Sequence, residues 1–285
     1  MKTFSPNKLI INAAITGTVL MEKDTPYVPL TVKAIVQDAV RCCASGASVL
    51  HVHARDEKGV PTCNKEIYGK IIRQIREKCP AVIICASTSG RMFSAFEQRS
   101  AVLALKGAEK PDMASLTLGS LNFAKQVSVT APEMIEKLAL KMRENGIVPE
   151  LEVFEPGMIN AAKVFIKRGV LAAPFYFNIL LGSVFSVQAK QADLNYMVSK
   201  LPEGVPWGAA GIGRAQLPVN FSAMMMGGHV RVGLEDNIYY DRARKKFASN
   251  EMLIRRIVRL AEKAGRDIAS PGEARDIIGL GTAPG

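Results

Sequence analysis

A regular alternation of two kinds of segment along the 285-residue chain is the feature that most constrains its fold. Short runs rich in β-branched residues predict strands, and each is followed by a stretch whose apolar residues recur at helical spacing. Eight such pairs, with no Pro-, Gly- or Ser-rich linker between them, match the size and order of a (β/α)8 TIM barrel, whereas six strands would favour a doubly wound sheet. We predict a single barrel domain over residues 1–285 with a C-terminal helical extension.

The predicted segments alternate from end to end. The strands are Leu9–Ile15, Ser48–His53, Val82–Ala86, Met113–Leu118, Val148–Phe154, Phe175–Leu180, Pro206–Ala210 and His229–Gly233. The helices are Val32–Ala44, Lys65–Lys78, Phe96–Leu105, Pro132–Glu144, Ile159–Lys167, Asp193–Lys200, Gln216–Met225 and Asn250–Ala264. Polar residues gather where these strands end, which is where a barrel of this kind carries its active site.

Composition narrows the class of protein. A hydrophobic content of 48% is enough for a large core and excludes a disordered or collagen-like chain. We find neither an export signal nor an apolar run long enough to cross a membrane, and five cysteines without a C-x-x-C pair suit reduced thiols, so we expect a cytoplasmic protein. The net charge of +11 is spread along the chain and comes with no nucleic-acid motif, which favours a phosphate-bearing small molecule as the partner.

Two of the three histidines form an H-x-H pair, His51 and His53, in a predicted strand. Side chains two apart on a strand point to the same face, so both imidazoles face one way and can bind one metal ion. The alternative is a pair of histidines hydrogen-bonded inside the barrel. His229, near the start of the eighth strand, is expected on the barrel floor or in a loop.

A catalytic metal site needs about three protein ligands, and we choose Glu235, just beyond the eighth strand, as the third. A solvated loop or helix cap is the alternative for this residue. A metal bound in this way can polarise a carbonyl and acidify the neighbouring carbon. Asp236 is then placed to take the proton, and Arg231 to hold the charge that develops. These residues alone fit metal-dependent aldolases equally well.

Five segments together resemble the β-keto acid cleavage enzymes, a family that includes the 3-keto-5-aminohexanoate cleavage enzyme of lysine fermentation. They are NAAITG (12–17), ASVLHVHARD (47–56), PELEVFEPGM (149–158), WGAAGIGR (207–214) and GGHVRVGLEDNIYY (227–240). The resemblance implies a (β/α)8 homotetramer that binds zinc or another divalent metal through His51, His53 and Glu235. It also implies condensation of a β-keto acid with acetyl-CoA to give acetoacetate and a new acyl-CoA.

The resemblance assigns further roles by similarity. It implies that Asp236 is the base, that Arg231 and Ser87 assist it and the developing oxyanion, and that the substrate site is lined by Ser87, Gly90, Ser115 and Thr117. Ser115 and Thr117 stand where the lysine-pathway enzyme has threonine and asparagine. Glu152, in the fifth strand, is assigned either to the substrate and its surroundings or to an ion pair of the barrel.

One departure from the family bears on the substrate. Val19 stands where a glutamate of the lysine-pathway enzyme meets the substrate's ammonium group. Loss of that charge-assisted hydrogen bond costs about 1.5–3 kcal/mol. We therefore expect a β-keto acid with an apolar or neutral tail, although Glu22 or Asp24 could replace the glutamate from the same loop. The departures in the loop 181–186 put CoA binding there in doubt, and a basic region that includes Arg242 and Arg244 is either a solvated face or a contact for CoA phosphates.

Two other functions are weighed against this one. A metal-dependent aldolase or hydrolase on the same barrel would act without acetyl-CoA. A nucleic-acid-binding protein would use the basic charge but gives no role to His51, His53 and Glu235.

Overall fold

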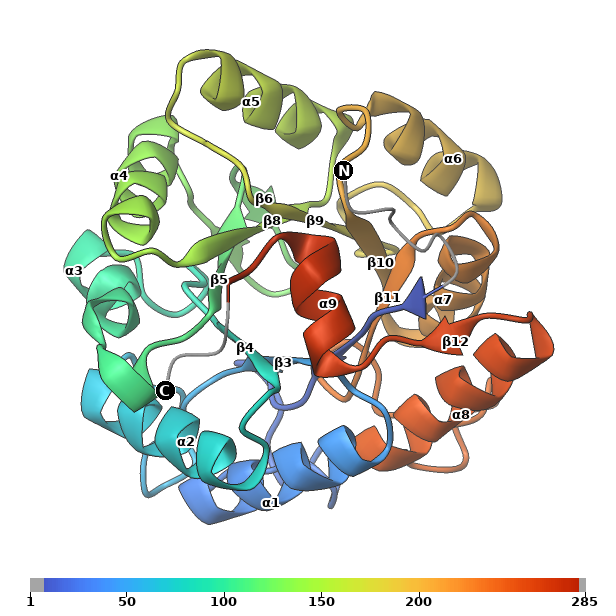
Figure 1. Cartoon of the computed structure of the whole chain (residues 1–285). Coiled ribbons are helices and arrows are strands. Elements are labelled where there is room, and N and C mark those ends of the chain that lie inside the picture. Colours follow the sequence, from blue (N-terminus) through green and yellow to red (C-terminus); the bar gives the residue numbers. More distant parts are fainter. Residues whose placement is uncertain (1–7, 282–285) are drawn as a thin grey trace.

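The computed structural model describes residues 8–281 and contains the barrel that the sequence predicts. Parallel strands close in the order β10-β11-β2-β3-β4-β5-β8-β9, and a ring of helices surrounds them (Figure 1). The barrel strands are β2 (Ile11–Ala14), β3 (Val49–Val52), β4 (Ile83–Ala86), β5 (Met113–Thr117), β8 (Val148–Val153), β9 (Tyr176–Leu181), β10 (Trp207–Gly211) and β11 (His229–Val232).

The ring helices follow the strands as expected. They are α1 (Val32–Ala44), α2 (Lys65–Lys78), α3 (Phe96–Ser100), α4 (Pro132–Glu144), α5 (Pro156–Lys167), α6 (Gln191–Lys200), α7 (Gln216–Met225) and α8 (Asn250–Lys263). No helix of the described chain is both long and apolar enough to cross a bilayer.

The third predicted helix, Phe96–Leu105, is wrong as a single element. The α-helix α3 ends at Ser100, and a 3-10 helix continues over Ala101–Ala104. The fifth helix begins at Pro156, three residues before the predicted start, because proline is favoured in the first turn, where its missing N–H is not needed. Periodicity predicts that these helices exist, but it does not predict where they begin or whether their last turn is an α-helix or a 3-10 helix.

Side chains along each strand point alternately outward, to the helices, and inward, where they form layers inside the barrel. Outward side chains such as Leu50, Ile84 and Leu151 belong to the apolar core that includes buried residues of the helices. Inward side chains start with an apolar layer at the amino ends of the strands, which includes Val49 and Ile83. Because side chains two apart share a face, the next inward positions along these strands carry the polar groups of the site.

Segments outside the eight pairs close the amino end of the barrel. The helix α9 (Pro271–Ile278) lies across this end in Figure 1, and its Ala274 and Ile278 pack on the apolar layer inside. The short strands β1 (Lys8–Leu9) and β12 (Asp267–Ile268) pair in parallel beside it. The buried carboxylate of Asp112 accepts hydrogen bonds from Arg275 of α9 at 2.7 Å and from Arg76 of α2 at 2.9 Å. This end is therefore plugged, and a ligand has to enter from the other.

At the opposite end, two features shape the loops. A hairpin of β6 (Leu121–Asn122) and β7 (Val127–Ser128) follows β5. The loop after β2 is held by the buried guanidinium of Arg55, which donates to the carbonyls of Gly17 at 2.6 Å and Leu20 at 3.1 Å. Gly17 has a φ of +68°, and a Cβ there would lie 2.8 Å from Cγ of Glu235, so glycine lets this loop pass directly beside that residue.

Candidate active site

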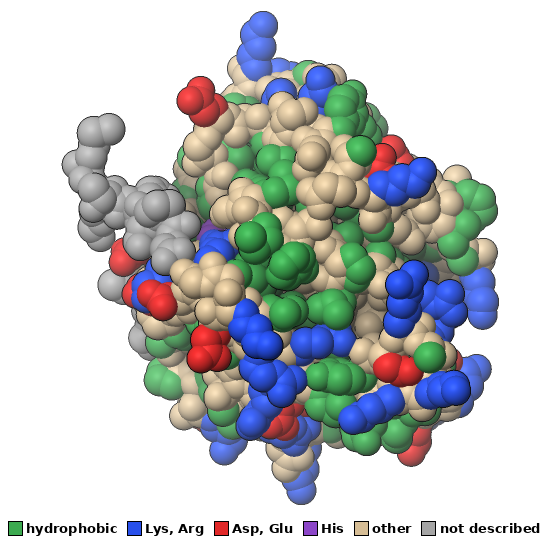
Figure 2. Space-filling model, turned by 90° about the vertical axis from the view of Figure 1, so that its right-hand side faces the viewer, with side chains coloured by type: hydrophobic (Ala, Val, Ile, Leu, Met, Phe, Trp, Pro, Cys, Tyr) green, Lys and Arg blue, Asp and Glu red, His purple; other side chains and the backbone are tan. Residues whose placement is uncertain are grey.

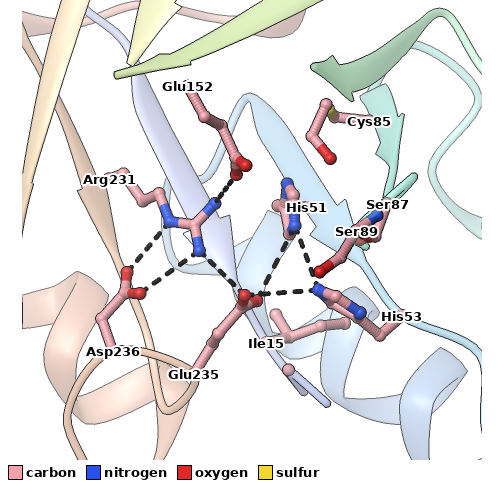
Figure 3. Close-up of polar contacts among 12 residues, drawn as sticks. Ile15, His51, His53, Cys85, Ser87, Ser89, Glu152, Arg231, Glu235 and Asp236 are labelled. Carbon is pink, nitrogen blue, oxygen red and sulfur yellow. Dashed lines mark hydrogen bonds and ion pairs between the residues drawn. The ribbon is translucent and has the colours of Figure 1, made fainter. Parts of the chain in front are cut away.

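The three predicted metal ligands converge at the open end of the barrel (Figure 3). Nε2 of His51, in β3, lies 3.2 Å from Nε2 of His53, which directly follows this strand and extends to the same side. Oε1 of Glu235 lies 3.3 Å from Nε2 of His53, and Oε2 lies 3.8 Å from Nε2 of His51. Both histidines are buried, and the glutamate reaches them from the turn after β11, two strands from β3 in the closed barrel.

A hydrogen-bond network behind His51 fixes its orientation. Oε2 of Glu150 lies 3.0 Å from Nδ1 of His51, while Oε1 accepts hydrogen bonds from the side-chain amides of Asn12 at 2.7 Å and Asn178 at 3.0 Å. A buried carboxylate at Nδ1 places the proton there and leaves the Nε2 lone pair free to face His53 and Glu235. The network therefore favours the tautomer that a metal requires.

The donor set fits a divalent metal. Bonds of about 2.0–2.1 Å in a tetrahedral arrangement would hold ligand atoms about 3.3 Å apart, close to the separations between these groups. Oε2 of Glu235 is buried and has no hydrogen-bond partner in the described chain, which is costly for a carboxylate oxygen unless a cation satisfies it. The two imidazole nitrogens and this oxygen are ligands suited to zinc.

The charges of the site influence protonation in opposite directions at the two histidines. Burial and Arg231 disfavour a proton on His51, but Glu235 and Glu150 outweigh them and raise its pKa. Burial lowers the pKa of His53. Burial also opposes ionisation of Glu235, yet its interactions with His53 and the positive charge of Arg231 hold its pKa well below the usual range. Glu235 is therefore an anionic ligand, and His53 is neutral near pH 7.

A second group of potential ligands overlaps the first. Cys85 and Glu150 lie near Nδ1 of His51, with Sγ of Cys85 3.2 Å from Oε2 of Glu150. Burial raises the pKa of this thiol well above its usual value, so it is protonated and donates to the carboxylate. Both oxygens of Glu150 are already engaged, Oε1 by two side-chain amides and Oε2 by His51 and Cys85, so this group supports His51 rather than forming a second metal site.

Arg231, on β11, is surrounded by three carboxylates (Figure 3). Its Nε and Nη2 lie 3.0 and 3.2 Å from the two oxygens of Asp236, in a bidentate pair. Its Nη2 also lies 3.0 Å from Oε1 of Glu235, and its Nη1 3.3 Å from Oε1 of Glu152. The guanidinium therefore fixes the relative positions of Glu235 and Asp236.

Asp236, the partner of Arg231 in the bidentate pair, is buried. Burial raises the pKa of its carboxyl group, although Arg231 opposes the shift. A carboxylate with a raised pKa is a stronger proton acceptor than an exposed one. The pKa of Glu152 is raised as well, because the effect of burial outweighs that of Arg231. Thr117 donates a hydrogen bond to Oε2 of this glutamate at 2.8 Å. The arrangement can therefore move a proton next to a metal-polarised group.

A cavity of about 230 Å³ opens above these groups. Its polar wall includes the predicted residues His51, His53, Ser87, Thr117, Glu152, Arg231, Glu235 and Asp236. Three other predicted substrate residues are not in the wall. Ser115 is buried and accepts a hydrogen bond from the backbone N–H of Thr88 at 3.2 Å, the side chain of Val19 is half exposed, and Gly90 packs against Arg99, where a Cβ would lie 2.7 Å from the guanidinium.

Sequence reasoning missed several residues of the site. The sequence pattern assigns no role to Glu150, Asn12, Asn178 or Cys85. Thr18, Ser89 and Arg91 line the cavity as well. The inward register of Asn12, Cys85, Glu150 and Asn178, each two positions from another inward residue, is the signal that could have found the support network. His229 lies on the barrel floor as predicted, where its Nδ1 accepts a hydrogen bond from the N–H of Ile10 at 3.1 Å.

Comparison with known proteins decides the family. Residues 8–280 match the family model of the beta-keto acid cleavage enzymes. The chain belongs to the β-keto acid cleavage enzyme family. The resemblance seen in the sequence motifs is thereby confirmed, and the chain is an enzyme of this type.

Two curated relatives align over nearly their whole lengths. A 3-keto-5-aminohexanoate cleavage enzyme of Fusobacterium nucleatum is 42% identical over 96% of this chain and 98% of its own. A 3-oxoadipate:acetyl-CoA acetyltransferase of Cupriavidus necator is 33% identical over 95% of this chain and 94% of its own. The members that this chain resembles therefore differ in their substrates.

Solved structures support the fold. The apo structure of ObcA superposes with a TM-score of 0.80 at 21% identity over 90% of this chain, which spans about two thirds (66%) of the ObcA chain. A type I 3-dehydroquinate dehydratase of Clostridium difficile matches with a TM-score of 0.56 at 7% identity, over 92% of this chain and 94% of its own. At these identities the likeness concerns the barrel alone.

Proposed function

We propose that this enzyme condenses a β-keto acid with acetyl-CoA and releases acetoacetate and a new acyl-CoA. The observation that carries the proposal is the convergence of two histidines and a carboxylate beside the Arg231–Asp236 pair, at the wall of one cavity. Relatives named as acetyl-CoA-dependent transferases, such as the 3-oxoadipate:acetyl-CoA acetyltransferase, support the use of acetyl-CoA.

In this proposal His51, His53 and Glu235 hold a divalent metal, with zinc the ion that suits their donor atoms. The bound metal would polarise the keto oxygen of the substrate and thereby acidify the adjacent carbon. Glu150 keeps His51 in the tautomer that leaves Nε2 unprotonated.

Asp236 takes a proton from the carbon between the keto and carboxylate groups. This carbon then forms a bond to the acetyl carbon of acetyl-CoA, and the CoA thiolate leaves. The thiolate adds to the original keto carbon, the bond between that carbon and the former nucleophile breaks, and the proton held by Asp236 returns to the carbon of the departing acetoacetate. Arg231 holds Asp236 in place and stabilises its carboxylate before the first transfer and after the second, and Ser87 donates to the developing oxyanion from the cavity wall.

The proposed substrate has an apolar or neutral tail. Val19 stands at the position that meets an ammonium group in the lysine-pathway enzyme, but it lies outside the cavity wall, so the preference for a tail depends on the wall itself. The carboxylates of the wall are engaged: Glu152 and Asp236 pair with Arg231, and Glu235 with Arg231 and His53.

The rest of the wall also disfavours an ammonium group. Arg91 adds a positive charge, its guanidinium 3.8 Å from the centre of the Phe123 ring. Apolar side chains complete the wall, namely Leu121, Phe123, Phe154, Leu180, Val184 and Ile212. These surfaces can bury an alkyl tail but offer no free carboxylate to a cation.

The test is a product assay on purified enzyme of known metal content. Acetoacetate and acyl-CoA are measured with acetyl-CoA and a panel of β-keto acids that carry alkyl, carboxylate or ammonium tails. We expect turnover only with acetyl-CoA, and the highest kcat/KM with the alkyl tails. Preference for the ammonium tail would overturn the substrate assignment, and cleavage without acetyl-CoA would favour the aldolase or hydrolase alternative.

The metal dependence has a separate readout. Chelator-treated enzyme should lose activity and recover it with zinc or another divalent metal, and His51→Ala should purify without stoichiometric metal. Full activity in metal-free enzyme would contradict the ligand assignment. Assembly as a homotetramer and a cytoplasmic location stay predictions, which size-exclusion chromatography with light scattering and cell fractionation would check.

A further inference from the structure

A second cavity, of about 570 Å³, lies beside the first at the open end of the barrel. It is formed by the segment after β10, the first turn of α7 and the loop 237–244 after β11, with Arg256 of α8. The backbone N–H of Gly213, in its wall, donates to the carbonyl of Asp236 at 2.7 Å. Ile212 and Asp236 line the first cavity, and their neighbours in the chain, Gly213 and Asn237, line the second, so the two cavities adjoin at these two segments.

The second cavity is strongly cationic. Four arginines line it, and none of them forms an ion pair with a carboxylate within residues 8–281: Arg214, Arg242, Arg244 and Arg256. Asp241 is the one acidic residue of the described lining, and its carboxylate is engaged by the backbone N–H groups of Lys245 at 3.0 Å and Lys246 at 2.8 Å. Figure 2 shows Lys and Arg side chains gathered in the lower part of the face that includes α7 and α8.

The loop that carries two of these arginines has a defined shape. The N–H of Tyr240 donates to the carbonyl of Lys246 at 2.9 Å, and the rings of Tyr239 and Phe247 stack at 5.2 Å. Nη1 of Arg256 donates to the carbonyl of Tyr240 at 2.6 Å and fixes the loop to α8. Arg244 adopts a φ of +58°, an unfavourable conformation for a side chain other than glycine, and it is held there by these surroundings.

The position of the cavity also favours a phosphate. β10 and β11 are the seventh and eighth strands of the barrel, and the loops after these two strands frequently bind phosphate groups. The first turn of α7, through Leu217 and Pro218, faces the same space. Guanidinium groups bind phosphate oxygens through paired hydrogen bonds, which suits several phosphates at once.

We infer that this cavity binds the 3′-phosphorylated ADP portion of acetyl-CoA, with Arg242 and Arg244 in contact with its phosphates. The inference rests on the proposed function. The pantetheine arm extends from this cavity past Gly213 to the first one, where its thioester meets the substrate. In this placement the nucleotide of acetyl-CoA lies in the second cavity, and its thioester lies in the first.

The test compares Arg242→Gln and Arg244→Gln with a matched control, Arg255→Gln. Arg255 belongs to the same basic region but lies outside the cavity, 65% exposed and paired with Glu251 at 2.8 Å. Loss of one charge-assisted contact should raise the KM for acetyl-CoA about tenfold or more, with kcat nearly unchanged. The control should change neither constant, and S-acetylpantetheine, which lacks the nucleotide, should be used equally well by all the proteins. Unchanged KM values in the two variants, or an equal loss with S-acetylpantetheine, would overturn the inference.

Direct binding separates this inference from the proposed function. Calorimetry with adenosine 3′,5′-bisphosphate and with inorganic phosphate needs no turnover. If the wild type bound the bisphosphate, and Arg242→Gln and Arg244→Gln weakened it while Arg255→Gln did not, the nucleotide site would stand even if acetyl-CoA were not a substrate. Equal affinity for inorganic phosphate, or no binding of the bisphosphate by the wild type, would count against a nucleotide site.

Discussion

Nδ1 of His51 and Oε2 of Glu150 lie 3.0 Å apart in the interior of the barrel, on strands that are not neighbours. The contact crosses the barrel and joins the second strand to the fifth. It leaves the other imidazole nitrogen directed at His53 and Glu235. The geometry of the proposed metal site therefore depends on Glu150, which forms no hydrogen bond with His53 or Glu235 within the described residues.

Glu150→Gln tests this dependence. A glutamine cannot serve as an anionic partner for Nδ1–H of His51, so we expect the affinity for zinc to fall about 10–100-fold, with all three ligands in place. Competition with a chelating dye measures it. Glu136→Gln is the control, because Glu136 is a glutamate of α4 that pairs with Arg168 away from the site. Equal zinc affinity in both variants would show that Glu150 does not orient His51.

Asp236→Asn separates proton transfer from metal binding. The asparagine keeps a similar shape beside Arg231 but cannot accept the substrate proton, so kcat should fall about 10²–10⁴-fold. Zinc content and the zinc affinity should stay close to those of the wild type, because the three ligand side chains remain. Steady-state kinetics and metal analysis on the same preparation make the measurement. Full turnover with bound metal would refute the assignment of Asp236 as the base.

The sequence predicts the parts of this molecule that depend on local spacing. The eight strand and helix pairs and the shared face of His51 and His53 follow from periodicity, and the need for a third metal ligand beyond the eighth strand selects Glu235, in agreement with the family motifs. Contacts across the barrel do not follow, because the partner of His51 is set by strand tilt and closure rather than by distance along the chain. Val19, chosen because it stands where the lysine-pathway enzyme has a glutamate, lies half exposed, while Thr18 lines the cavity, because the direction of a loop side chain does not follow from sequence spacing.

Asp112→Asn tests how α9 is held under the barrel. The carboxylate of Asp112 is buried between Arg76 and Arg275, and it also accepts the N–H of Ile84 at 2.9 Å. Removal of its charge leaves two buried guanidinium groups without an anion, so the free energy of unfolding should fall by about 3–5 kcal/mol. Urea denaturation measures the change. Asp267→Asn, where the aspartate is 72% exposed beside Lys8, should cost under about 1 kcal/mol, and a similar cost for both would contradict the argument.

His229 makes the stability of the fold depend on pH. Burial lowers the pKa of this histidine from 6.5 to about 3, so the native protein keeps it neutral where the unfolded chain binds a proton. The contribution of neutral His229 to the free energy of unfolding is therefore fully present above the pKa of the unfolded chain, about 6.5, and is lost as the pH falls from there towards 3. The loss amounts to about 2 kcal/mol between pH 7 and pH 5.

His229→Asn isolates this contribution. The asparagine carbonyl can accept the N–H of Ile10 in place of Nδ1 but does not titrate, so the variant should lose about 2 kcal/mol less than the wild type between pH 7 and pH 5. Urea denaturation of metal-depleted protein at both pH values compares the two, because the proposed metal ligands His51 and His53 then contribute equally to each. If the wild type and the variant lost the same free energy of unfolding between pH 7 and pH 5, His229 would have to take up a proton in the folded state. That result would contradict the argument that burial keeps His229 neutral.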